Sequence, residues 1–112
     1  MTVALADLDK SRDEIVIVDA GTLRIRHVSG AALERLGYTR DEVEGCDVSV
    51  IGPEYPRELL PAPHGAGDNG QRERRILIEH RARDGSQFLM RAHIRIHRVQ
   101  QCLNFVISAV LA

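Results

Sequence analysis

The histidines and cysteines are the side chains of this sequence best suited to chemistry, and their spacing limits what they can do. His93 and His97 fall on one face of a predicted strand, where a separation of four residues places their Cα atoms about 13 Å apart. This distance is too long for both rings to bind one zinc ion. The two cysteines, Cys46 and Cys102, match no metal-binding or redox spacing. We therefore expect no metal site and no disulfide framework.

The other histidines favour structural roles. His27 and His80 fall within predicted strands, where a histidine more often packs than binds a ligand. His64 lies in a loop rich in glycine and proline, which would hold a ligand poorly. The sequence has no Gly-x-Ser-x-Gly motif, no phosphate-binding glycine loop and no His-x-x-x-His pair on a predicted helix. The sequence therefore predicts a protein that is not an enzyme.

The length and composition indicate one small domain. The 112 residues have a mass of 12.5 kDa, with 44% hydrophobic and 28% charged side chains, close to the average of globular proteins. No apolar run approaches the ~18 residues of a membrane span, and residues 1–14 are too acidic for a signal peptide. We therefore expect a cytoplasmic protein without membrane contact.

The net charge of −1 conceals an uneven distribution along the chain. Residues 1–71 contain 7 basic and 13 acidic side chains, a net charge of −6, whereas residues 72–98 contain 8 arginines and 3 acidic side chains, a net charge of +5. A basic segment can attract nucleic acid, but only Phe88 interrupts this one as an aromatic residue. Its arginines alternate with apolar residues, which is typical of a solvated sheet face. We therefore expect no nucleic-acid partner, and RNA or DNA binding is the weakest alternative.

The hydrophobic pattern differs on the two sides of a stretch rich in glycine and proline at residues 61–70. Before it, two extended runs predict a hairpin, and Ser, Thr and Gly signals mark short helices. After it, apolar and polar residues alternate, which predicts an antiparallel meander of three strands with a hairpin turn at Asp84 and Gly85. The predicted strands are 14–19, 23–28, 75–81, 87–97 and 102–111, and the predicted helical segments are 31–36, 39–45, 48–51 and 54–60.

This order of elements predicts an α+β domain, in which short helices pack on one face of a five-stranded antiparallel sheet. Four segments at the joints of this arrangement carry distinctive residues: Asp13–Asp19, Val28–Ala32, Leu36–Gly45 and Arg83–Phe88. The most specific are Leu-Gly-Tyr followed by a Glu-x-x-Gly helix, and an Arg-Asp-Gly-Ser turn about forty residues later. In these segments the sequence resembles the PAS family of sensory modules. The resemblance implies a PAS domain at 13–112, preceded by a capping segment at 1–12.

The resemblance also implies a function. It points to a sensory and dimerisation domain of a larger bacterial signalling protein, such as a histidine kinase, a cyclic-di-nucleotide enzyme or a chemoreceptor. Ser29 stands where the family commonly has Asn, and a hydroxyl also caps a helix. The sequence ends without the family's Asp-Ile-Thr motif, so either it is a piece of a longer protein, which we expect, or its link to an effector differs from that of the family. The family often has an ion pair at the positions of Glu42 and Arg83, which would fasten the helical side to the sheet.

The cofactor-binding branches of the family allow two specific tests. Flavin photosensors of the light-oxygen-voltage type carry a reactive cysteine where this sequence has Val48, and Cys46 lies two residues too early. Haem-binding members supply an axial histidine from the helix before the third strand. The predicted helix Glu54–Leu60 contains none, and His64 lies just beyond it. We therefore expect neither flavin nor haem nor another cofactor, and a haem-based gas or redox sensor is the weaker alternative.

Two sets of apolar residues are candidates for binding. The first set lies between the sheet and the helices in the predicted fold. It would either line a pocket for a small apolar or amphipathic ligand or form the core of a ligand-free relay module. Its members are Ile17, Ile25, Leu36, Val50, Leu60, Ile78, Met90, Ile94, Phe105 and Ile107. The second joins an outward strip of the sheet to the amphipathic segment 1–12, whose acidic residues would approach the basic strands; it comprises Val3, Leu5, Leu8, Leu77, Leu89, Val106 and Val110. This second set predicts a homodimer.

Overall fold

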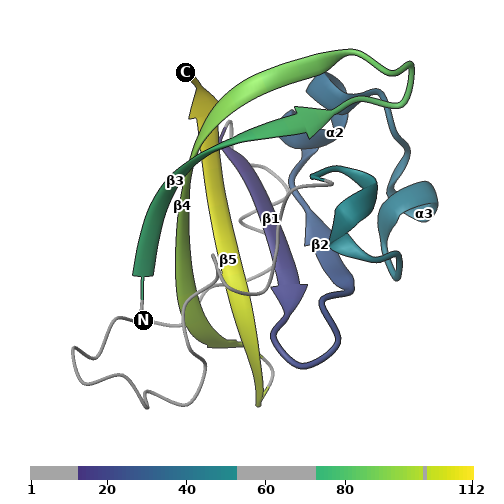
Figure 1. The fold of residues 1–112 in the computed structure, drawn as a ribbon. Coiled ribbons are helices and arrows are strands. Elements are labelled where there is room, and N and C mark those ends of the chain that lie inside the picture. Colours follow the sequence, from purple (N-terminus) through teal and green to yellow (C-terminus); the bar gives the residue numbers. More distant parts are fainter. Residues whose placement is uncertain (1–12, 53–72, 100) are drawn as a thin grey trace.

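The core of the architecture is a five-stranded antiparallel sheet with the strand order β2-β1-β5-β4-β3 (Figure 1). The computed structural model describes residues 13–52, 73–99 and 101–112. The strands are β1 (Glu14–Asp19), β2 (Ile25–Val28), β3 (Glu73–Arg81), β4 (Gln87–Val99) and β5 (Cys102–Leu111). The predicted fold class is therefore confirmed. The two halves of the chain meet where β1 pairs with β5 in the middle of the sheet.

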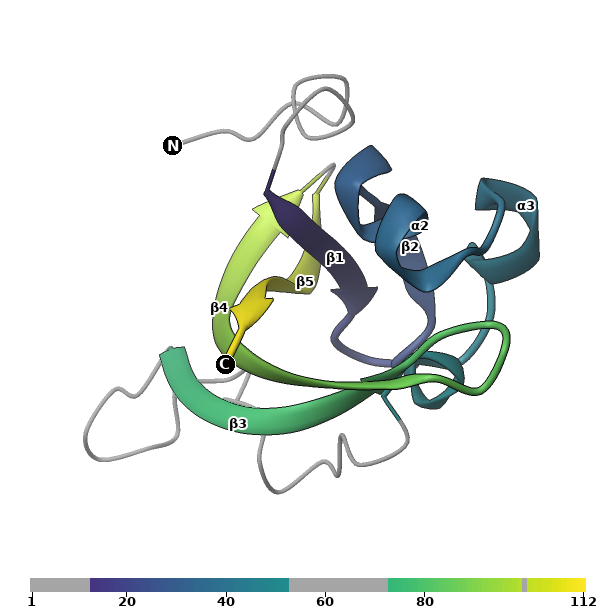
Figure 2. The ribbon, with the colours of Figure 1, turned by 90° about the horizontal axis from the view of Figure 1, so that it is seen from above.

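Three short helical elements follow β2 and lie on one side of the sheet (Figures 1 and 2). They are α2 (Gly30–Leu36), α3 (Arg40–Val43) and the 3-10 helix η1 (Val48–Val50). The predicted helix 54–60 and the loop 61–70 lie outside the described residues. None of the described helices is long and apolar enough to cross a membrane.

The turn between β1 and β2 explains why β2 is shorter than the sequence predicts. The Asp19 carboxylate accepts hydrogen bonds from the backbone N–H groups of Gly21 and Thr22, at 2.8 and 2.9 Å. Leu23 then adopts a left-handed conformation, with a φ of 62°, which no strand residue can have. The second strand consequently begins at Ile25 instead of residue 23.

Ser29 joins the first helix to the sheet. Its Oγ accepts hydrogen bonds from the N–H of Ala32, at 3.4 Å, and from the N–H of Ile15, at 2.9 Å. The hydroxyl donates to the carbonyl of Asp13, at 2.7 Å. The predicted N-cap is therefore present, and it also fixes the position of α2 against β1. The predicted stop is present as well, because Gly37 ends α2 with a φ of 77°.

The side chains that face the helices form the main core. They come from all five strands and pack against Leu36, Val43, Val48 and Ile51 of the helical segment. A second, smaller cluster of Ile15, Ile17 and Val106 is separate from this core. The sheet divides the protein into an inner face, which packs on the helices, and an outer face.

The register of β1 decides to which face each of its residues belongs. Val16 is paired with Ile107 and Ile17 with Val106, and residues paired in this way share a face of the sheet. Val16 and Ile107 belong to the main core, so Ile17 lies on the outer face. The expectation that Ile17 lines the inner pocket is therefore wrong.

Candidate functional site

The predicted inner-pocket residues are largely where the sequence places them. Six of them share the main core: Ile25, Leu36, Ile78, Ile94, Phe105 and Ile107. Met90 is fully buried, and Val50 is partly buried against the same cluster. Leu60 lies outside the described residues. The described members of this set therefore pack in or against one buried cluster, apart from Ile17 on the outer face.

The outer face carries the exposed apolar side chains. Leu77, Leu89 and Val110 are 62%, 50% and 61% exposed. Leu77 and Val110 flank Arg91 in one row across β3, β4 and β5, because both are paired with it. Three apolar residues predicted to lie on the outward strip are thus exposed on the outer face of the sheet.

The other members of the predicted dimer surface differ. Val106 does belong to the outer face but is only 3% exposed, because it clusters with Ile15 and its direct partner Ile17. The expectation that Val106 extends the exposed strip is therefore wrong. The three apolar candidates of the N-terminal segment, Val3, Leu5 and Leu8, lie outside the described residues.

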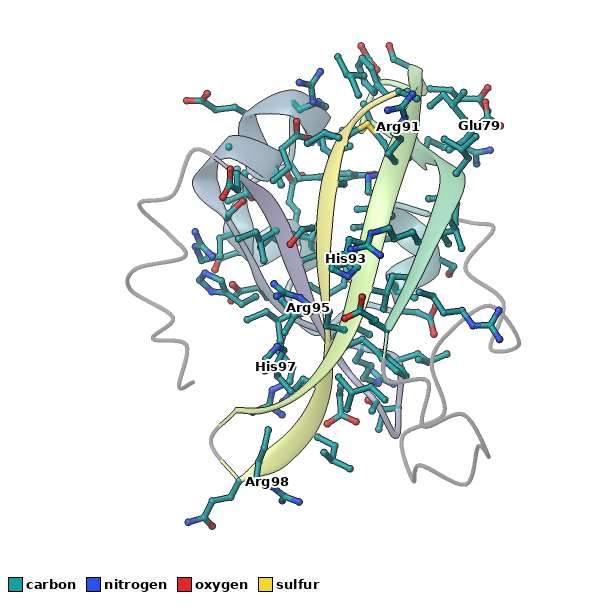
Figure 3. The ribbon with its side chains drawn as sticks, turned by 90° about the vertical axis from the view of Figure 1, so that its left-hand side faces the viewer. Glu79, Arg91, His93, Arg95, His97 and Arg98 are labelled. Atoms are coloured by element: carbon teal, nitrogen blue, oxygen red, sulfur yellow. The ribbon has the colours of Figure 1, made fainter. Side chains whose placement is uncertain are left out.

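A row of basic side chains follows β4 along the same face. Figure 3 looks onto it and shows Arg91, His93, Arg95 and His97 one after another along the strand. Glu73 on β3 is the acid in contact with this row, at 3.3 Å from Nε2 of His93. The part of the chain that the structure describes holds no ion pair for Arg91 or Arg95. The described part of the outer face therefore combines exposed apolar groups with an excess of positive charge.

An open groove of about 500 Å³ lies between these two kinds of residue. Its polar lining consists of Arg75, Arg91, His93 and Ser108, and its apolar lining includes Leu77 and Val110. Ile76 and Ala92 contribute only to its floor, because they are a cross-strand pair whose side chains face the core. Sequence reasoning missed Arg75 and Ser108, since nothing along the chain shows that the register places them beside His93.

A second hollow, of about 650 Å³, lies where the helices meet the β3–β4 turn. Here Nε of Arg83 lies 2.9 Å from Oε2 of Glu42, so the ion pair expected from the sequence is present. The pKa of Glu42 is lowered, first by the hydrogen bond from the Thr39 N–H and then by the Arg83 charge. The Arg83 N–H also donates to the carbonyl of Leu36, at 2.8 Å. The pair therefore fastens the turn to the helices.

The described histidines differ in burial and in the charged groups around them. His80 is 3% exposed, and burial lowers its pKa to about 4, so its ring is neutral at neutral pH. Burial and the neighbouring Arg95 also lower the pKa of His97. His27 is buried, with Nδ1 3.6 Å from a carboxylate oxygen of Glu44. Within residues 13–52, 73–99 and 101–112, no three His, Cys, Asp or Glu side chains are grouped to hold a metal ion.

The flavin-type cysteine position can be checked directly. Val48 occupies it, with 2% exposure, inside the main core. The thiol of Cys46 instead donates to the Glu42 carbonyl, with a distance of 3.3 Å from sulfur to oxygen. Adduct chemistry of the light-oxygen-voltage type has no nucleophile at this position. His64, the haem candidate, lies outside the described residues.

Comparisons with known proteins agree with this geometry. No protein-family model and no curated protein matches the sequence. Among solved structures, the chain is similar to the PAS domain of an HTR-like protein from Haloarcula marismortui, with a TM-score of 0.75, 19% identity, and 96% of this chain and 93% of the other covered. A PAS domain from a two-component sensor histidine kinase gives 0.74 at 10% identity, with 96% and 92% covered.

A light-oxygen-voltage domain studied with a flavin analogue is also similar, with a TM-score of 0.68, 20% identity, and 96% and 82% of the two chains covered. At sequence identities of 10–20%, these similarities show the fold alone. The similarity to the two PAS domains extends over more than nine-tenths of each chain. The chain has the PAS domain fold.

Proposed function

We propose that this chain is a sensory relay domain that acts as a homodimer through the outer face of its sheet. The observation that carries the proposal is the exposed strip of Leu77, Leu89 and Val110 on that face. Large side chains that remain half-exposed and adjacent on a sheet commonly meet a partner. A second copy of the chain is the occupant to which we commit.

The charge distribution supports a particular arrangement of the two copies. Two basic outer faces would repel each other, because Arg91 and Arg95 have no ion-pair partner in the described part of the chain. The segment 1–12 carries Asp7 and Asp9 among apolar residues, so it offers both the charge and the apolar contacts that the face needs. We propose that this segment contributes to the dimer interface.

The inner face has a packing role in this proposal. Met90 and Ile94 are fully buried, and Ile94 belongs to the main core cluster. A domain of this size needs such side chains to fold. We therefore place the relay function in the sheet and its outer face, and we propose a module that works without a ligand in its core. Native mass spectrometry would contradict this if freshly purified protein retained the added mass of a small molecule.

The similarity to a PAS domain of a two-component sensor histidine kinase supports a role in signal transduction. We propose that the domain belongs to a larger bacterial, cytoplasmic signalling protein and passes a signal to an effector without catalysing a reaction. A kinase, a cyclic-di-nucleotide enzyme and a chemoreceptor remain the candidate parents. Neither haem nor flavin takes part in the proposed mechanism.

The proposal is tested by deleting residues 1–12 and measuring molar mass by light scattering. We expect a dimer for the full chain and a monomer, or a less soluble species, for the shortened chain. Circular dichroism of both proteins shows whether the fold is retained. A full chain that stays monomeric at high concentration, or a dimer that is indifferent to the deletion, would contradict the proposed interface.

A further inference from the structure

The groove on the outer face exists because one side chain of β5 is small. Ser108 lies between Val106 and Val110 on the outward side of the strand, and its hydroxymethyl group leaves space that a larger residue would fill. The directly paired residue on β4 is His93, which is paired in turn with Arg75 on β3. The volume of the groove, about 500 Å³, is within the range of small-molecule sites, roughly 300–1,000 Å³.

One part of the groove is strongly cationic. Arg75 and Arg91 are diagonal neighbours on adjacent strands, because Arg75 is paired with His93 and Arg91 with Leu77. Diagonal neighbours in a sheet are about 7–8 Å apart, which lets two long side chains converge on one small group between them. Both guanidinium groups can donate paired hydrogen bonds to a carboxylate.

Two described acids, Glu73 and Glu79, lie on this face beside the groove. They do not offset the three guanidinium groups of Arg75, Arg91 and Arg95 on the same face. Glu73 is shared, since its Oε1 lies 3.5 Å from Nη1 of Arg75 and 3.3 Å from Nε2 of His93. Arg91 has no ion pair within the described ranges. The groove therefore has an excess of positive charge and favours an anion.

The remaining wall of the groove is apolar. Leu77 and Val110 are both more than half exposed, and they stand on either side of Arg91 in the same row. Leu89 continues the apolar surface on β4, two residues before Arg91. A ligand that fits both the cationic side and the apolar wall of the groove has an anionic head group and an aliphatic chain. The chain would cover these leucine and valine side chains and remove their surface from water.

We propose that the outer groove binds an aliphatic carboxylate, with its head group between Arg75 and Arg91 and its chain along Leu77 and Val110. Ser108 and His93 lie beside the head group and provide further polar contacts. This site is on the opposite face of the sheet from the main core. It goes beyond the dimerisation proposed above, although the two share the outer face, and a bound carboxylate would compete with a second copy there.

The test uses octanoate as the probe and isothermal titration calorimetry as the readout, in a buffer without carboxylates. Octanamide, which lacks the charge, and acetate, which lacks the chain, serve as matched probes. We expect octanoate to bind at least about tenfold more tightly than either, because the site needs both parts. Backbone amide shifts should change at Arg75, His93 and Ser108.

Two variants and a matched control locate the site. We expect Arg75→Gln and Arg91→Gln each to weaken octanoate binding about tenfold. Arg74→Gln should leave it unchanged, because Arg74 is paired with the core residue Ile94 and therefore faces the other side of the sheet. Equal losses for Arg74→Gln and Arg75→Gln, or equal binding of octanoate and octanamide, would overturn the proposal.

The titration is run at two protein concentrations, one below and one above the onset of self-association measured by light scattering. Binding at the lower concentration and weaker binding at the higher one is expected if a second copy competes for the groove. Absence of octanoate binding at both concentrations would refute the groove site alone. The dimer proposal is judged separately by the molar mass of the chain without ligand.

Discussion

Acidification below pH 6.5 should destabilise the domain chiefly through one buried side chain, His80. Its imidazole is 3% exposed, and burial lowers its pKa from 6.5 to about 4. Between these two values the unfolded chain binds a proton on this ring and the folded chain does not. The contribution of the neutral His80 ring to the free energy of unfolding is therefore fully present above pH 6.5, and it is lost as the pH falls towards 4.

The size of the effect follows from the two pKa values. One pKa unit corresponds to about 1.4 kcal/mol, so the full loss is about 3 kcal/mol. At pH 5 about 2 kcal/mol of this is already lost, whereas carboxylates with ordinary pKa values are still mostly ionised. The pH range from 7.5 to 5 therefore reports mainly on histidines.

The assay is urea denaturation of the wild-type chain and of His80→Gln, which cannot be charged, at pH 7.5 and pH 5. We expect the free energy of unfolding to fall by about 2 kcal/mol more in the wild type than in the variant between these two conditions. NMR titration of the ring provides a direct check. Parallel losses in the two proteins, or a ring pKa near 6.5, would refute the reasoning.

Further predictions concern the joints of the fold and its cofactor content. Ser29→Ala should lower the free energy of unfolding by about 2 kcal/mol, because it removes a helix cap and leaves the buried N–H of Ile15 unpaired; an unchanged urea midpoint would contradict this. Gly37→Ala should cost about 1 kcal/mol in the same assay, since its φ is 77°, and a stabilised variant would be the opposite result. Arg83→Gln should hardly change stability but should speed amide exchange in the β3–β4 turn, and unchanged exchange would show that the ion pair does not fasten it. Purified protein should be colourless, because Val48 stands at the position of the reactive cysteine and the predicted helix Glu54–Leu60 contains no axial histidine; a flavin or Soret band in an absorption spectrum would contradict that expectation.

The long strands β4 and β5 were predictable from the sequence. In β5 the predicted bounds are those observed, Cys102–Leu111, because one face is apolar and buried while Ser108 and Val110 mark the other. The β4 strand was found for the same reason, although it extends to Val99. A period of two fixes the face of every residue once one face is assigned.

β1 shows where this reasoning fails. Residues 15–18 are all apolar, so no alternation distinguishes the inward from the outward side. The sequence therefore predicts the wrong face for Ile17. An uninterrupted apolar run is itself a signal that both faces of a strand are covered, and it could have revealed the outer cluster of Ile15, Ile17 and Val106.

The groove could not be predicted because it depends on pairing between strands. Arg75, His93 and Ser108 are separated by 15 or more residues in the sequence, and only the registers of β3 with β4 and of β4 with β5 bring them into one row. The sequence shows which residues are charged, whereas the strand register decides which of them become neighbours. The left-handed conformation of Leu23, which delays β2, likewise has no signal in the residue type.

The central claim, that two copies pair through the outer face, is tested most directly by aspartate substitutions at two consecutive residues of β5. Val110 and Leu111 are 61% and 51% exposed, but Val110 is paired with Arg91 on the outer face and Leu111 with the buried Met90 on the inner face. The measurement is the molar mass of Val110→Asp and Leu111→Asp by light scattering across a dilution series. We predict that Val110→Asp is monomeric where the wild type and Leu111→Asp are dimeric. Dimers of equal strength in all three proteins, or equal losses in both variants, would contradict the claim.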